Sequence, residues 1–363
     1  MNQNGSRQVA DVSQERRIEM KDTSRKYLIV KGVGGVGNRF TSLMKAIKYA
    51  KKTNRTIYLE WCDGMFGPTG ENIFFKYFDL KNVAYTDSPD EVLELLDKGS
   101  STFPRILHKE DITNALLKNY YACTPWIAQF PIYKVGMGLV FQYKLGYLFG
   151  LQSFQRVDDE KGYWGAIRDI FKGDNFPLGA ALPTWLTQDI VVFADFRPLC
   201  SIARLFDYIQ LKDSFYQQYK KYADENKFSN VIGVHVRYTD KKPKSQLKKL
   251  IGRLQSDLER NAELKIFLCS DNNDIINQFR NIFQDKVIFF EKEMPNVDHG
   301  GIHKWAYWYF EEDQKEQLFY DCLADMWLLS MTKYLYWQGN SSFSLISKVI
   351  KNDDSTTFDW LKF

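Results

Sequence analysis

A run of cationic residues follows one apolar stretch of the sequence. Residues 231–236 read VIGVHV, which predicts a buried strand, and they lead directly into RYTDKK at 237–242. Seven Lys and Arg residues face a single acid, Asp240, between residues 237 and 253. A guanidinium can grip phosphate oxygens through a bidentate, charge-assisted fork. Arg237 is the best candidate because an arginine directly after a buried strand is costly without an anionic partner, whereas Lys248, Lys249 and Arg253 also fit a solvated helix face.

Two further polar segments follow apolar strands in the same half of the chain. Asp271 ends the strand 265–271, where a carboxylate could accept from the ring N–H and the exocyclic amine of guanine. Helix capping by Asp271 or Asn273 is the alternative. The segment WQGNSSFS at 337–344 is a strand, a turn and a helix start, which offers hydroxyls and free N–H groups to a phosphate. Simple serine capping explains that segment equally well.

A glycine-rich loop, GVGGVGN at 32–38, joins the first strand to the first helix. Gly32, Gly34 and Gly37 match the spacing of a dinucleotide-binding loop, and Glu60 ends the next strand, where a ribose-binding acid belongs. The loop also approaches a P-loop, but Asn38 and Arg39 stand where Lys and Ser or Thr are needed. Any tightly packed strand-to-helix turn would need such glycines, so all three interpretations stay open.

Alternating strands and helices must position these residues. Apolar runs and helical spacings predict strands at 27–30, 56–61, 190–196, 231–236, 265–271, 287–290 and 334–337, and helices at 40–49, 211–226, 247–263, 275–283 and 318–331, with a last helix after 342. A βαβ alternation predicts parallel sheets in an α/β protein. We expect a loose leader at 1–25, one domain at 26–205, a second at 206–345, and a C-terminal helix at 346–363 that packs back on the first domain.

Composition limits the function classes. At 363 residues the chain is long enough for two domains. The net charge of +4 argues against a nucleic-acid partner. Five widely spaced cysteines and four scattered histidines predict free thiols and no metal site. The polar first 26 residues contain no secretory signal, and the apolar run at 135–151 is broken by Gln142 and Lys144. These features predict a cytoplasmic protein and are compatible with peripheral membrane contact.

Together, these motifs resemble the α-1,6-fucosyltransferase superfamily, which includes the rhizobial nodulation fucosyltransferase and the eukaryotic core fucosyltransferase. HVRYTDK at 235–241 is similar to the family's H-V-R-R-T-D-K, and CSD at 269–271 is similar to A-T-D-D. SSFS at 341–344 follows a Leu-Ala-Asp-Met-Trp helix, as in the family. GVGNRF at 35–40 resembles the G-x-G-N-R-L loop of related bacterial glycosyltransferases.

The resemblance implies a GT-B fold, with two Rossmann-like doubly wound domains facing an interdomain cleft. The first domain would bind the acceptor and the second GDP-fucose, and transfer would be inverting and independent of metal or other cofactor. By the resemblance, Arg237, Asp240 and Lys241 are catalytic. The donor-binding residues would be His235, Arg237, Asp271, Ser341, Ser342, Ser344, Gly35, Gly37, Asn38 and Arg39.

The sequence departs from the family in ways that affect the chemistry. Tyr238 replaces a second arginine, Asn272 replaces a second acid, and Ser245-Gln246 occupies the stretch where the core enzymes carry a glutamate. The general base is therefore open among Asp240, Glu293, Asp298 and His303. The aromatic stretch 300–310 includes Trp305 and Tyr307, which could stack on an acceptor sugar or pack in a core.

The expected function is transfer of fucose from GDP-fucose to a sugar hydroxyl of a glycan acceptor, such as a bacterial surface polysaccharide or an oligosaccharide. The same chemistry with another GDP-sugar is one alternative. An NAD-dependent oxidoreductase, suggested by Gly32, Gly34, Gly37 and Glu60, is a second. A noncatalytic glycan-binding protein is a third.

Overall fold

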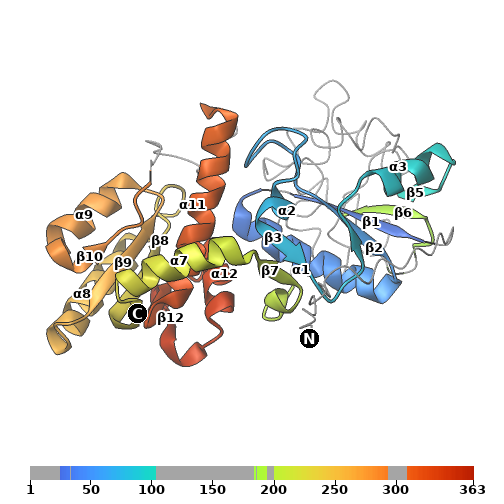
Figure 1. Ribbon diagram of the computed structural model, residues 1–363. Helices are drawn as coiled ribbons and strands as arrows, with labels where there is room; N and C mark the ends of the chain where they lie inside the picture. Colours follow the sequence, from blue (N-terminus) through green and yellow to red (C-terminus); the bar gives the residue numbers. More distant parts are fainter. Residues whose placement is uncertain (1–24, 33, 104–183, 185, 194–199, 293–308) are drawn as a thin grey trace, which may run out of the picture.

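The computed structural model describes residues 25–32, 34–103, 184, 186–193, 200–292 and 309–363 (Figure 1). The N-terminal lobe contains strands β1 (Tyr27–Lys31), β2 (Thr56–Glu60), β3 (Phe78–Leu80), β4 (Tyr85–Thr86), β5 (Thr102–Phe103), β6 (Ile190–Phe193) and β7 (Ile209–Leu211), and helices α1 (Val36–Thr53), α2 (Ile73–Tyr77) and α3 (Asp90–Asp97). The C-terminal lobe contains strands β8 (Val231–Val236), β9 (Lys265–Ser270), β10 (Val287–Ile288), β11 (Tyr334–Trp337) and β12 (Thr357–Asp359), and helices α7 (Asp213–Glu225), α8 (Lys244–Arg260), α9 (Asn273–Phe283), α11 (Glu312–Met331) and α12 (Ser342–Lys351).

Each lobe is built on a parallel sheet of five strands. The strand order is β4-β2-β1-β6-β5 in the first and β10-β9-β8-β11-β12 in the second. In both sheets the order reverses beside the first strand, which is the doubly wound topology. Two Rossmann-like α/β lobes, as the sequence predicted, are confirmed.

The central strands β1 and β8 are buried along their whole length. Helices α8 and α9 pack on one face of the C-terminal sheet, and α11 packs on the other (Figure 1). A parallel sheet covered on both faces needs near-continuous apolar strands, which is why VIGVHV and YLIVK could be recognised without alternation.

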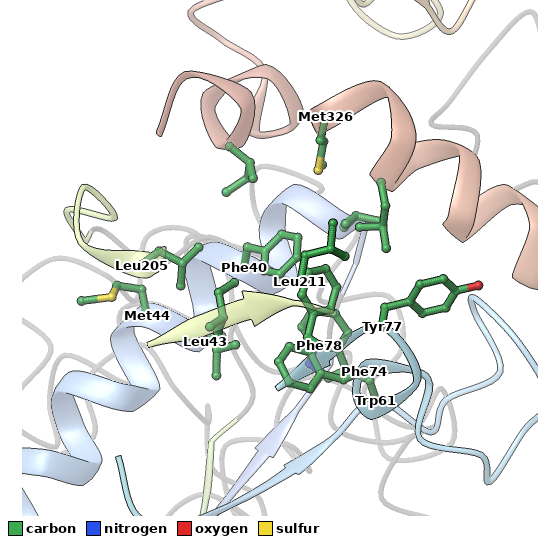
Figure 2. Close-up of a cluster of buried hydrophobic side chains, with 14 of the residues drawn as sticks. Phe40, Leu43, Met44, Trp61, Phe74, Tyr77, Phe78, Leu205, Leu211 and Met326 are labelled. Carbon is green, nitrogen blue, oxygen red and sulfur yellow. The ribbon is translucent and has the colours of Figure 1, made fainter. Parts of the chain in front are cut away.

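One aromatic core joins the two lobes. Figure 2 shows side chains of α1, α2, β3 and β7 packed beside α11. The rings of Phe78 and Trp327, which come from opposite lobes, lie 5.7 Å apart, and Phe206 contacts the same tryptophan at 5.7 Å. Many of the chain's aromatic residues therefore pack in this core rather than being available to stack on a ligand.

The chain divides differently from the predicted boundaries in two places. Strand β7 pairs antiparallel with β3, so residues 209–211 lie with the N-terminal lobe and not with the domain expected from 206. The last helix begins at Ser342 and packs on α1, but the segment after it returns to pair β12 with β11 in the C-terminal sheet. The predicted unit 346–363 thus contributes to both lobes.

Four of the five cysteines lie among the described residues, and all four are free thiols, as predicted. No helix in the described ranges is long and apolar enough to cross a membrane. The apolar run 135–151 and Cys123 lie outside the described residues. A cytoplasmic location stays a prediction.

Candidate nucleotide-diphosphate site

The loop after β8 is fastened to the loop after β11 where the strand order of the C-terminal sheet reverses. The Arg237 N–H donates to Oε1 of Gln338 at 2.7 Å, and Nε2 of Gln338 donates back to the Arg237 carbonyl at 3.3 Å. Gln338 is fully buried. Ligands of doubly wound proteins bind at this point of the sheet. Gln338 was not predicted as a site residue, because a single glutamine after a strand carries no sequence signal.

Arg237 lies at this strand-order reversal, directly after β8, and its side chain pairs with Asp240. Its Nε and Nη2 donate to the two Asp240 carboxylate oxygens at 2.6 and 2.5 Å. A guanidinium has five N–H donors, so three have no partner among the described residues. Burial alone would raise the pKa of the Asp240 carboxyl, but hydrogen bonds and charge from Arg237, aided by Lys241, lower it overall. Lys241 donates to the Asn340 carbonyl, which draws a second cation toward the loop after β11.

Asp271 reaches the same edge from β9. Its Oδ1 accepts from the Tyr238 and Thr239 N–H groups at 2.6 and 3.2 Å. Burial raises the pKa of this carboxyl, and the two backbone N–H groups oppose the rise. The structure thus uses Asp271 to shape the Arg237 loop. The N-cap of α9 is Asn272, which accepts from the Ile275 N–H, and not Asp271 or Asn273 as the capping alternative had it.

The three serines predicted at the start of α12 have different surroundings. Ser341 is the N-cap, and its buried Oγ has no hydrogen-bond partner in the described part of the chain. Ser342 opens the helix and is half-buried. Ser344 is fully buried, and its hydroxyl bonds both the N–H and the carbonyl of Gln338 at 3.2 Å, so it closes the turn.

The N-termini of α1 and α12, one from each lobe, meet. A Cβ on Gly37 would lie 2.5 Å from the backbone C and O of Ser342. Gly35 is the N-cap of α1, and Asn38 is half-buried in its first turn. Free N–H groups and the positive ends of two helix dipoles therefore converge at the lobe junction, which favours a bound anion.

Gly37→Ala tests this close approach. Because the added Cβ meets backbone, one lobe must shift, and we expect the free energy of unfolding to fall by about 1–3 kcal/mol. The matched control is Gly252→Ala in α8, where no heavy atom lies within 4 Å of the new Cβ and alanine should stabilise by about 0.5–1 kcal/mol. Urea unfolding of both variants provides the comparison. A Gly37→Ala protein as stable as the wild type would show that the helices do not abut.

His235 lies beneath the site as a buried neutral ring. It stacks on Phe343 with ring centroids 5.0 Å apart, and the Trp360 indole donates to its carbonyl at 2.9 Å. Nδ1 has no hydrogen-bond partner among the described residues. Burial, reinforced by the charges of Arg237 and Lys292, lowers the pKa of His235 to about 3. His235 therefore joins β8 to α12 rather than supplying a cation at neutral pH.

This buried ring predicts an acid-sensitive fold. The folded pKa lies below the ordinary 6.5, so between about pH 6.5 and 3 only the unfolded chain takes up the proton, and stability falls as the pH falls. From pH 7 to pH 5 the wild type should lose about 2 kcal/mol more than His235→Gln, which cannot titrate. Urea unfolding at both pH values measures the difference. Equal losses in the two proteins would contradict a neutral buried His235.

The predicted donor-binding Arg39 is buried in the N-terminal lobe. Its Nη2 donates to Oδ2 of Asp63 at 2.5 Å and its Nε to the Gly34 carbonyl at 2.9 Å. The guanidinium also lies over the rings of Trp61 and Phe66. Gly34 has φ of 72°, a conformation that favours glycine. In this conformation Arg39 shapes the glycine loop from below and presents only 1% of its surface to solvent.

Glu60 does not present an open carboxylate where the dinucleotide interpretation needs one. It is 3% exposed and forms a buried ion pair with Lys31 at the end of β1. Burial lowers the pKa of Lys31 to about 7. In this geometry Glu60 does not offer the open carboxylate that a ribose-binding acid needs.

Other predicted residues lie beyond the described part of the chain. These are the acceptor candidates Trp305 and Tyr307 and the general-base candidates Glu293, Asp298 and His303. One charged pair near the site was not predicted: Lys292 binds Asp325 of α11, and both are largely buried. Among the described residues, no group of three or more His, Cys, Asp or Glu side chains could hold a metal ion.

Solved structures share this architecture. The crystal structure of NodZ alpha-1,6-fucosyltransferase soaked with GDP-fucose is 17% identical, with a TM-score of 0.52 over 90% of this chain and 92% of that one. Fucosyltransferase NodZ from Bradyrhizobium is 16% identical, with a TM-score of 0.52 over 90% and 93%. NodZ co-crystallised with GDP is 17% identical, with a TM-score of 0.50 over 90% and 92%. No protein-family model and no curated protein sequence matches the chain.

The chain therefore has a GT-B fold of the kind found in the NodZ fucosyltransferases. The likeness extends over nine-tenths of both chains, so it includes both lobes. The resemblance drawn from HVRYTDK and the other motifs is confirmed at the level of the fold.

Proposed function

We propose that this protein transfers fucose from GDP-fucose to a sugar hydroxyl of a glycan acceptor, with inversion at the anomeric carbon and without a metal ion. The observation that carries the proposal is the junction of Gly37 with Ser342. It places two helix N-termini at the strand-order reversal where Arg237 and Lys241 gather. That arrangement suits a diphosphate, and the fold is shared with structures obtained with GDP-fucose and with GDP.

In the proposed reaction, the acceptor hydroxyl oxygen attacks C1 of fucose as the bond from C1 to the diphosphate oxygen breaks. Negative charge develops on the departing GDP. Arg237, Lys241 and the N–H groups at the start of α12 would stabilise that charge. A general base takes the hydroxyl proton. The pairing of Asp240 with Arg237 lowers the pKa of Asp240 and makes it a weak base, which favours the other candidates, Glu293, Asp298 and His303.

A transfer assay tests the proposal. The full chain is incubated with either GDP-fucose or GDP-mannose and a mixture of oligosaccharides, and GDP release and glycan mass are followed together. We expect GDP release that depends on acceptor and a product heavier by one deoxyhexose. Transfer only from GDP-mannose would favour the alternative donor. Glycan binding without GDP release from either donor would favour the noncatalytic alternative.

A further inference from the structure

A pocket lies between the two lobes, lined by residues of α2, α7 and α11. It is a pocket open to solvent with a volume of about 370 Å³, within the range of small-ligand sites. It is lined by Lys76, Tyr77, Phe215, Asp313, Glu316, Gln317 and Tyr320. We call it the junction pocket. None of these residues belongs to the nucleotide-diphosphate site.

Aromatic rings form one part of the junction pocket. Tyr77 of α2 and Phe215 of α7 lie 4.6 Å apart between ring centroids, and Phe215 lies 6.2 Å from Tyr320 of α11. The Tyr320 hydroxyl donates to Gln218 at 3.1 Å, which holds that ring in place. Rings held by neighbours in this way offer apolar surface without further loss of side-chain freedom on binding.

Hydrogen-bonding groups form the other part. Asp313 and Glu316 outnumber the one cation, Lys76, which is already paired with Glu316. The Glu316 carboxylate has further acceptor sites, because a carboxylate offers about four lone-pair positions. Excess negative charge disfavours a phosphate or any other anion. Apolar rings beside carboxylate and amide groups instead suit a neutral polyol, whose C–H faces pack on rings and whose hydroxyls donate to acids.

One face of α11 connects the junction pocket to the nucleotide site. Gln317 donates to Asp321 at 2.9 Å, and Asp325 lies one turn further, paired with Lys292. The charge of Lys292 acts on His235, which lies two residues before Arg237 in the sequence. Gln317 and Asp325 are eight residues apart, about 12 Å along the helix. A ligand that reaches from the pocket past Asp325 toward the donor must therefore be longer than a single sugar residue.

We propose that the junction pocket binds a non-reacting sugar residue of a neutral acceptor oligosaccharide. This inference rests on the proposed function and adds to it the class of acceptor and the place where it is held. Because the pocket has walls from both lobes, a bound glycan would also tie the lobes together. Binding energy from such a remote residue can be used to orient the reacting hydroxyl.

The test is binding of the labelled full chain to an oligosaccharide array, with GDP affinity measured in parallel. The pocket variants are Phe215→Ser and Gln317→Ala. Their matched controls are Tyr216→Ser, the exposed neighbour on α7, and Glu312→Ala on α11, neither of which lines the pocket. We expect the wild type to bind a set of neutral oligosaccharides. Both pocket variants should bind them at least tenfold more weakly, and both controls should bind them as the wild type does. GDP affinity should be the same in all five proteins.

Two results would overturn the inference. One is that the protein binds no neutral oligosaccharide on the array, whether or not it binds cationic ligands. The other is glycan binding that the pocket variants leave unchanged. If GDP still binds in either case, only the junction pocket is wrong; loss of GDP binding in the wild type would instead refute the proposed function.

Discussion

Replacing Arg237 by alanine is expected to weaken GDP binding by about tenfold to 150-fold. Charge-assisted hydrogen bonds contribute about 1.5–3 kcal/mol, and each 1.4 kcal/mol is a factor of ten in affinity. The GDP affinity of Arg237→Lys should lie between those of the wild type and Arg237→Ala, because lysine keeps the charge and loses the planar fork. Isothermal titration calorimetry with GDP measures all three.

The matched control for Arg237 is Arg253→Ala. Arg237 pairs with an aspartate three residues later, and Arg253 pairs with an aspartate four residues later. Unlike Arg237, Arg253 lies on the exposed face of α8. Its loss should leave GDP affinity unchanged. If Arg237→Ala binds GDP as tightly as Arg253→Ala does, the diphosphate is not held at the strand-order reversal of the C-terminal sheet.

Asp63→Ala should have the largest effect on stability. It would leave the Arg39 guanidinium buried without its acid, although Nη1 already has no hydrogen-bond partner among the described residues. Breaking a buried pair on one side costs about 3–5 kcal/mol. Removing both charges in Asp63→Ala/Arg39→Met should recover most of that loss, because the uncompensated charge is gone.

Urea unfolding of the two proteins and of Glu225→Ala measures the effect. Glu225 pairs with Lys221 on the surface, and exposed pairs of this kind contribute about 0–1 kcal/mol. An Asp63→Ala protein no less stable than Glu225→Ala would mean that Arg39 is not held in the buried position. In that case Arg39 would be free to serve the donor, as the sequence resemblance implied.

The fold could be predicted from the sequence because its parallel strands are covered on both faces. VIGVHV and the YLIV of residues 27–30 are near-continuous apolar runs; the first leads into the polar RYTDKK loop and the second into the glycine-rich loop. The same logic placed Arg237, Asp271 and Ser341 at one edge, since parallel strands end together.

Contacts between distant segments could not be predicted in the same way. Nothing in the sequence indicates that Gly37 touches Ser342, that Gln338 clamps Arg237, or that Asp63 draws Arg39 inward. The glycine loop therefore left a dinucleotide, another anion and a packing role all open. The packing of α12 against α1 shows that Gly37 of this loop accommodates the backbone of Ser342.

Thermal unfolding with GDP, UDP, ADP and NAD tests most directly whether guanosine diphosphate binds this chain. At one hundred times its dissociation constant, a ligand specific for the folded state stabilises it by about 2.7 kcal/mol. We predict stabilisation of that size by GDP and much less by the other three ligands. Stabilisation by NAD with none by GDP would contradict it.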